Sequence, residues 1–140
     1  MSRVFWDTML FIYLLEGHPQ YAKKCKDLMV RSYERGDQLF TSNLALGEML
    51  AGRWQEGREA THAMRAQVSA LGFQFLPFDE NAVDTFSQLR AMQKLKIADA
   101  IHLSCAASAR VDLFLTGDKQ LHRIYVPGVQ FITNFESAPI

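Results

Sequence analysis

Residues 3–17 read RVFWDTMLFIYLLEG, a short apolar run and a longer apolar run separated by one carboxylate. The first run, Arg3–Trp6, has the length and composition of a buried strand, and residues 8–16 are typical of an apolar helix. Asp7 lies where the strand ends and the helix begins. Ligands of parallel sheets bind beyond the carboxyl ends of the strands. The position of Asp7 therefore predicts either a helix N-cap or a functional carboxylate.

The rest of the chain alternates between strand-like and helix-like segments. We expect strands at 38–41, 73–78, 111–116 and 129–133, and helices at about 21–35, 43–71, 79–92 and 96–110. Gly36 should end the second helix, and the third should break near Gly52 or Gly57. Short apolar strands separated by helices favour a parallel sheet with helices on both faces. The predicted fold is α/β, a three-layer α/β/α sandwich around a mostly parallel five-stranded sheet.

The composition is that of a globular protein. Of 140 residues, 49% are hydrophobic and 21% are charged, and no linker, repeat or low-complexity segment interrupts them. We therefore expect one domain over residues 1–140. Fifteen basic and fifteen acidic residues give a net charge of zero, so the overall charge gives no reason to expect a nucleic acid or a membrane as partner.

The cysteines and the N-terminal sequence bear on the compartment. Cys25 and Cys105 lie in helix-like, mostly apolar surroundings, which favours buried free thiols in a reducing compartment over a disulfide. The chain begins without a basic-then-apolar leader, and no apolar run reaches the length of a membrane span. These features predict a cytoplasmic protein that does not associate with membranes.

Four acidic residues occupy equivalent places in the predicted fold. Asp7 follows the first strand, and Asp118 follows the fourth strand in LFLTGD. Glu48 lies six residues after Ser42, which follows the second strand, and Asp99 opens the apolar helical run ADAIHLSCAA. We therefore expect the four carboxylates to converge at one edge of the sheet.

Such a cluster needs compensation for its charge. Two carboxylates about 5 Å apart repel by roughly 3 kcal/mol at an effective dielectric constant of about 20. Protons or a hard divalent cation such as Mg²⁺ or Mn²⁺ could compensate. A metal held by carboxylates suits phosphodiester hydrolysis, because it can activate water and polarise the phosphoryl group. Asp7 is thus expected to be the first ligand of an acidic metal site.

Each acid also has an ordinary structural explanation. Asp7 and Asp99 could cap helices or interact with the helix dipole from the first turn. Asp118 follows a glycine, as in many turns, and Glu48 could be a surface glutamate. These alternatives stay open for each acid taken singly. His102, three residues after Asp99, is expected to be a core or supporting histidine rather than a metal ligand, because Mg²⁺ prefers oxygen.

A metal site that acts on a phosphodiester polyanion would need positive charge nearby to bind it. Basic residues gather in three segments and are candidates for phosphate contacts, with a merely solvated surface as the alternative: Lys23, Lys24, Lys26, Arg31 and Arg35; Arg53, Arg58 and Arg65; Lys94 and Lys96.

Trp54 lies in a polar stretch and looks exposed. It could dock a partner helix or pack locally.

Four segments in this order, WDTMLFIYLLEG, TSNLALGEML, IADAIHLSCAA and LFLTGDKQL, together resemble the PIN domain family. Within it, they look like the toxin nucleases of VapBC toxin–antitoxin pairs. The resemblance runs from about Val4 to Thr133. It implies an α/β/α sandwich with a parallel five-stranded sheet, in agreement with the pattern of strands and helices.

The resemblance also implies roles for individual residues. Asp7 and Asp99 match the firmest metal ligands of the family. Glu48 and Asp118 match positions that bind a possible second ion or position the attacking water. The supporting hydroxyl residues of the family match Thr8, Ser42 and Thr116.

The implied activity is that of a Mg²⁺- or Mn²⁺-dependent endoribonuclease acting on structured RNA such as transfer or ribosomal RNA. Hydrolysis by a metal-activated water would leave 5′-phosphate and 3′-hydroxyl ends. The resemblance further implies a homodimer and inhibition by a cognate antitoxin protein. Two alternatives remain: a non-catalytic binding subunit that keeps the fold, and a Mg²⁺-binding receiver-like signalling module. The latter needs a lysine after a late strand, and Lys119 follows Asp118 too closely to fit.

Overall fold

The computed structural model describes all residues, Met1–Ile140. Strands and helices alternate along most of the chain, and three short 3₁₀ helices (η1–η3) join them. In chain order the elements are β1 (Arg3–Trp6), α1 (Thr8–Leu15), α2 (Ala22–Arg35), β2 (Gln38–Ser42), α3 (Asn43–Ala51), η1 (Trp54–Glu56), α4 (Arg58–Ser69), β3 (Gln74–Leu76), α5 (Glu80–Met92), α6 (Ile97–Ser108), β4 (Leu113–Thr116), η2 (Lys119–Arg123), β5 (Phe131–Asn134) and η3 (Phe135–Ser137).

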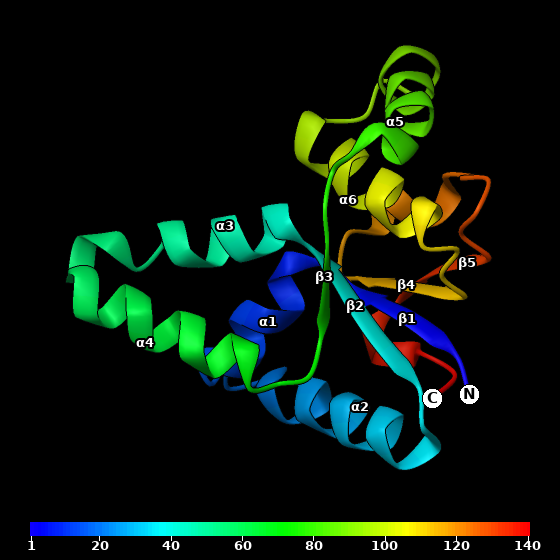
Figure 1. The fold of residues 1–140 in the computed structure, drawn as a ribbon. Helices are drawn as coiled ribbons and strands as arrows, with labels where there is room; N and C mark the ends of the chain where they lie inside the picture. Colours follow the sequence, from blue (N-terminus) through cyan, green and yellow to red (C-terminus); the bar gives the residue numbers. More distant parts are fainter.

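The five strands form one sheet in the order β3-β2-β1-β4-β5, and every neighbouring pair is parallel. The chain builds outward from β1 through β2 to β3, and then returns to add β4 and β5 on the other side (Figure 1). The order of the strands therefore reverses between β1 and β4. In open parallel sheets this reversal opens a crevice at the carboxyl ends of the two strands.

Helices cover both faces of the sheet, as predicted. Successive β1 side chains point to opposite faces: Val4 and Trp6 belong to one buried cluster and Phe5 to the other. The first cluster packs under helices α1 to α4, and the second under α5 and α6 (Figure 1). Each central strand is buried on both faces, which explains its continuous apolar sequence.

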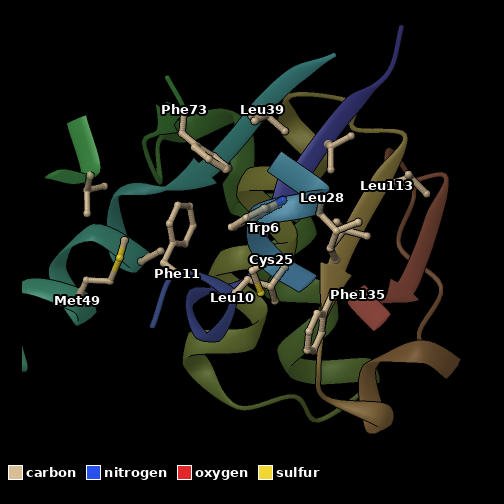
Figure 2. Packing of buried hydrophobic residues seen from close by; sticks show 14 of the residues in the cluster. Trp6, Leu10, Phe11, Cys25, Leu28, Leu39, Met49, Phe73, Leu113 and Phe135 are labelled. Atoms are coloured by element: carbon tan, nitrogen blue, oxygen red, sulfur yellow. The ribbon is translucent and has the colours of Figure 1, made fainter. Parts of the chain in front are cut away.

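Aromatic side chains fill the centre of the first cluster (Figure 2). The rings of Trp6, Phe11 and Phe73 meet in tilted and edge-on geometries, with centroids 4.7 to 5.2 Å apart. Phe11 comes from α1, so its packing fixes the helix that begins directly after β1. This packing holds the first turn of α1, and Asp7 before it, at the end of the strand.

Most of the predicted boundaries are confirmed within two residues. Gly36 ends α2 in the left-handed conformation with a φ of 74°, and Asp79 caps α5. The predicted helix over 43–71 is broken near both glycines, because α3 ends at Ala51, η1 follows Gly52 and α4 begins only after Gly57. The glycine at 57 has a φ of 105°, which no helix can contain.

The state of the two cysteines agrees with the sequence. Cys25 and Cys105 are both buried and free, and burial raises the pKa of each thiol, to about 12 and about 11. None of the helices is both long and apolar enough to pass through a membrane.

Gly128→Ala is expected to lower the free energy of unfolding by about 2 kcal/mol, because its methyl group would have to displace backbone. Gly128 has a φ of 99°, and an added Cβ would lie 2.7 Å from the carbonyl oxygen of Ala107 at the end of α6. Gly36→Ala is the matched control: its φ is also positive, but a Cβ would meet nothing within 4 Å. Its cost should be about 1 kcal/mol, that of the left-handed backbone alone. Equal losses for the two variants in urea denaturation would contradict this account.

Candidate metal-binding active site

An open pocket of about 370 Å³ lies at the carboxyl ends of β1 and β4, where the strand order reverses. All four predicted acids line it, together with the supporting Thr8 and Thr116. Ser42 is fully buried beneath the pocket and does not line it. The complete lining is Asp7, Thr8, Met9, Tyr13, Glu48, Ala98, Asp99, His102, Thr116, Gly117 and Asp118.

Asp7 is held from two sides. Its Oδ1 accepts a hydrogen bond from the backbone N–H of Thr8 at 2.8 Å, and its Oδ2 accepts one from the Thr116 hydroxyl at 2.7 Å. Its own N–H donates to the carbonyl of Leu115 at 3.0 Å, which extends the β1–β4 pairing by one residue. Asp7 thus caps α1 and also lines the pocket. The two interpretations from the sequence, a helix N-cap and a functional carboxylate, do not exclude each other.

Thr116 joins two of the acids. While its hydroxyl donates to Asp7, its oxygen accepts the backbone N–H of Asp118 at 3.0 Å. The Asp118 carboxylate in turn caps η2 through the N–H of Gln120 at 2.9 Å. Asp118 therefore lies in a turn, as the structural explanation from the sequence proposed. The same turn also places Asp118 in the pocket.

Asp99 lies in the first turn of α6, and no protein group donates a hydrogen bond to its carboxylate. Burial raises the pKa of its carboxyl above the ordinary value, and the carboxylates of Asp7 and Asp118 raise it further. His102 and Lys96 act in the opposite direction but do not reverse the shift. The pocket is therefore a region of negative potential that the surrounding protein compensates only in part.

Glu48 is not a stray surface residue. Its Oε1 accepts hydrogen bonds from the Thr8 hydroxyl at 2.8 Å and from Nε2 of His102 at 3.0 Å. The bond from His102 is the main reason that the pKa of Glu48 is lowered, and the bond from Thr8 adds to it, against a smaller opposing effect of burial. Thr8, Glu48 and His102 come from α1, α3 and α6, so these bonds join three helices at the pocket.

Five lining residues were not among the predicted site residues: Met9, Tyr13, Ala98, His102 and Gly117. His102 is buried and bonds both Glu48 and Ser42, in agreement with the expected core or supporting histidine. Met9 and Tyr13 line the pocket from one face of α1. Their spacing of four residues, directly after Asp7, is the signal from which they could have been found.

No lysine or arginine lines the pocket. Several of the basic candidates are engaged elsewhere: Arg31 and Arg35 donate to carbonyls of the last two residues, and Arg53 pairs with Glu16 and Glu56. Lys96 is the basic residue whose charge acts on Asp99, and Lys119 directly follows Asp118. Trp54 is 53% exposed at the turn between α3 and α4, as the sequence suggested.

The residues present suit an oxygen-binding cation. No three His, Cys, Asp or Glu side chains approach closely enough to form a closed metal site on their own. Mg²⁺ does not need one, because it keeps several waters and takes one or two carboxylates from the protein. Asp7 and Asp99 have the chemistry of such a pair. Burial raises the pKa of Asp99 most, and the repulsion from Asp7 and Asp118, which a cation would relieve, raises it further.

Comparisons with known proteins agree with this geometry. The model of the PIN domain family matches residues 4–127. No curated protein matches the sequence at a significant level.

Several solved structures share the fold. VapBC2 from Rickettsia felis, bound to a DNA fragment from its promoter, has a TM-score of 0.73 at 14% identity, with 94% of this chain and 98% of that chain covered. DNA-bound VapBC from Salmonella typhimurium has a TM-score of 0.72 at 19% identity, with 96% and 99% covered. VapC20 from Mycobacterium tuberculosis, a toxin that cleaves the sarcin-ricin loop, has a TM-score of 0.63 at 16% identity, with 87% and 96% covered. At these identities the likeness is one of fold.

Proposed function

Since the chain belongs to the PIN domain family, we propose that it is a metal-dependent endoribonuclease and the toxin of a toxin–antitoxin pair. The observation that carries this proposal is the pocket itself, which four carboxylates from different parts of the chain line and which no lysine or arginine lines. We propose that residues 1–140 form the nuclease as one domain. Family membership also leaves the receiver-like alternative without support.

The proposed roles follow from the contacts of each acid. Asp7 and Asp99 would hold Mg²⁺ or Mn²⁺, and Glu48 and Asp118 would hold a second ion or orient the water. When bound, the metal supplies a more acidic water and stabilises the charge on the phosphoryl oxygens. Thr116 keeps Asp7 and Asp118 in a fixed relation through its two hydrogen bonds. Thr8 restrains Glu48 through the hydrogen bond that its hydroxyl donates to Oε1.

The proposed substrate is structured RNA such as transfer or ribosomal RNA. The pocket is open, so a folded strand could present a phosphate to it, while Met9 and Tyr13 form an apolar wall against which a nucleotide could lie. Lys96 and Lys119 are the basic residues next to the acids, and we propose them for contacts with flanking phosphates. A sarcin-ricin loop is the RNA cleaved by the similar toxin from M. tuberculosis, which supports the class of substrate.

A cognate antitoxin, a homodimer and a cytoplasmic location belong to the same proposal. The two VapBC structures with the higher TM-scores above are complexes with an antitoxin, which supports that part of the proposal. Trp54 lies at the turn joining α3 and α4, a pair of helices that extends away from the sheet (Figure 1). A half-exposed tryptophan at such a place is suited to pack against a helix of a partner.

The test is cleavage of transfer RNA and ribosomal RNA by the purified chain, freed of any antitoxin. We expect cleavage in Mg²⁺ or Mn²⁺, loss of cleavage in EDTA, and products with 5′-phosphate ends. Asp84→Asn serves as a control, because Asp84 is exposed on α5 away from the pocket and should leave the rate unchanged. Cleavage that persists in EDTA would contradict the metal-dependent mechanism, and absence of cleavage on both RNA classes would favour a non-catalytic binding subunit.

A further inference from the structure

His102 is the most deeply buried of the ionisable side chains at the pocket, with 3% of its surface exposed. It projects from α6 and contacts three other elements. Its Nδ1 lies 2.8 Å from the hydroxyl oxygen of Ser42 at the end of β2, and its Nε2 lies 3.0 Å from Oε1 of Glu48 on α3. The same nitrogen lies 3.3 Å from the hydroxyl of Thr8 on α1. A buried imidazole with partners on both nitrogens is orientationally fixed.

The partners determine which nitrogen carries the hydrogen. A carboxylate can only accept, so Nε2 must donate to Glu48. In the neutral ring Nδ1 is then the acceptor, and the Ser42 hydroxyl must donate to it. Ser42 can do so because its oxygen separately accepts the N–H of Ala45, as the N-cap of α3. The bonds thus form one directed chain, from the Ala45 backbone through Ser42 and His102 to Glu48.

This chain acts on one oxygen of Glu48. His102 and Thr8 both donate to Oε1, and no protein group donates to Oε2. A glutamate with 39% of its side chain exposed would otherwise sample several rotamers. With Oε1 fixed, Oε2 is the oxygen left free at the pocket.

We propose that His102 is a positioning residue of this site: anchored by Ser42, it fixes Oε1 of Glu48 so that Oε2 is presented to the ion or water in the pocket. The inference rests on the proposed function and adds to it a residue that does not itself touch the substrate. Asp99 lies three residues before His102 on α6, so one helical turn carries both a ligand and the group that orients the opposite carboxylate. This arrangement holds Asp99 and Glu48 at a fixed spacing.

Two substitutions separate the contacts of His102. His102→Gln keeps an N–H that can reach Glu48, whereas His102→Asn is too short to do so and keeps only the contact toward Ser42. We expect His102→Asn to lower kcat by about 10- to 100-fold, with KM for RNA nearly unchanged, and His102→Gln to lose less than about 10-fold. Equal losses in the two variants would overturn the proposal, and circular dichroism spectra check that both variants are folded.

The second step tests whether His102 acts through Glu48. In the Glu48→Gln background, adding His102→Asn should lower kcat by no more than about twofold, because the carboxylate to be oriented is already gone. A loss as large as in the wild-type background would mean that His102 acts independently of Glu48, and the proposal would fall.

A third readout needs neither metal nor cleavage. In the ¹⁵N-labelled, metal-free protein at alkaline pH, imidazole correlation spectra should show the Nε2–H tautomer of His102. Glu48→Gln should shift that proton upfield, because a neutral amide is a weaker acceptor than a carboxylate. The Nδ1–H tautomer, or no response to Glu48→Gln, would overturn the proposal. A wild-type protein that fails to cleave RNA but passes this test would instead count against the proposed function alone.

Discussion

Asp7→Asn is expected to lower the rate of RNA cleavage by about a thousandfold, which corresponds to about 4 kcal/mol of activation free energy. The substitution removes a negative charge from a pocket whose proposed chemistry depends on binding a divalent cation. The structural role of Asp7 should survive, because asparagine caps helices as well as aspartate does and can still accept the N–H of Thr8. Its amide can also donate to the Thr116 oxygen in place of the present bond.

The measurement is kcat on the cleaved RNA alongside the melting temperature of each protein. Asp112→Asn is the matched control: Asp112 also accepts a backbone N–H, that of Arg3, but at the opposite ends of β1 and β4. The control should cleave at the wild-type rate. If Asp7→Asn cleaves as fast as the wild type, Asp7 takes no part in the chemistry.

The sequence predicted the centre of the sheet well because β1, β2 and β4 are buried on both faces. Val4, Phe5 and Trp6 are all apolar and all inaccessible to solvent, so no alternation was needed to recognise the strand. Gly36 indicated the end of α2, because glycine readily adopts the left-handed conformation found there. Asp79 indicated the start of α5, because its side chain can cap a helix. These signals depend only on neighbours in the chain, and for that reason they can be read without coordinates.

The starts of the last two strands were less accurate. Val111 and Val129 are buried and apolar, which made them look like strand residues. In the structure their N–H groups bond to the carbonyls of Ala106 and Val126, so each lies in a turn that leads into the strand. An apolar sequence pattern indicates that residues are buried, but a buried residue need not belong to a strand.

Convergence of the acids could be predicted from topology, whereas their hydrogen bonds could not. The position of each acid after a strand or at a helix start follows from the sequence. That Thr116 joins Asp7 to Asp118 depends on side-chain directions across two strands. The hydrogen bonds from Arg31 and Arg35 to the last two residues could not be predicted either, because they join segments more than a hundred residues apart in the chain.

Asp99→Asn is expected to lower cleavage by about a hundredfold and at the same time to raise the melting temperature of the metal-free protein. The pKa of Asp99 is raised in the folded state by burial and by the carboxylates of Asp7 and Asp118. Its ionisation therefore opposes folding: the penalty is absent below the ordinary pKa and develops as pH rises through the raised value. At neutral pH the variant should be more stable by about 0.5 kcal/mol after allowance for solvent screening, or about 2 °C.

Glu48→Gln should show the opposite sign of stability change with a similar loss of cleavage. The pKa of Glu48 is lowered, chiefly by the bond from His102, so its ionised form favours folding above its ordinary pKa. That contribution is lost as pH falls through the lowered value, and the difference between Glu48→Gln and wild type should vanish there. Thermal unfolding in EDTA from acidic to neutral pH measures both effects.

Divalent metal completes the contrast between the two variants. Mn²⁺ at a hundred times its dissociation constant should stabilise the wild type by about 2.7 kcal/mol, since only the folded pocket binds it. Asp99→Asn should gain far less, because it lacks one of the two proposed ligands. Repulsion among carboxylates that bind a cation lowers the stability of the metal-free protein. A variant that neutralises one ligand, and is more stable than the wild type without metal, therefore indicates such a site. Asp99→Asn that melts below the wild type in EDTA, or that gains as much from Mn²⁺, would show that Asp99 is a structural residue instead.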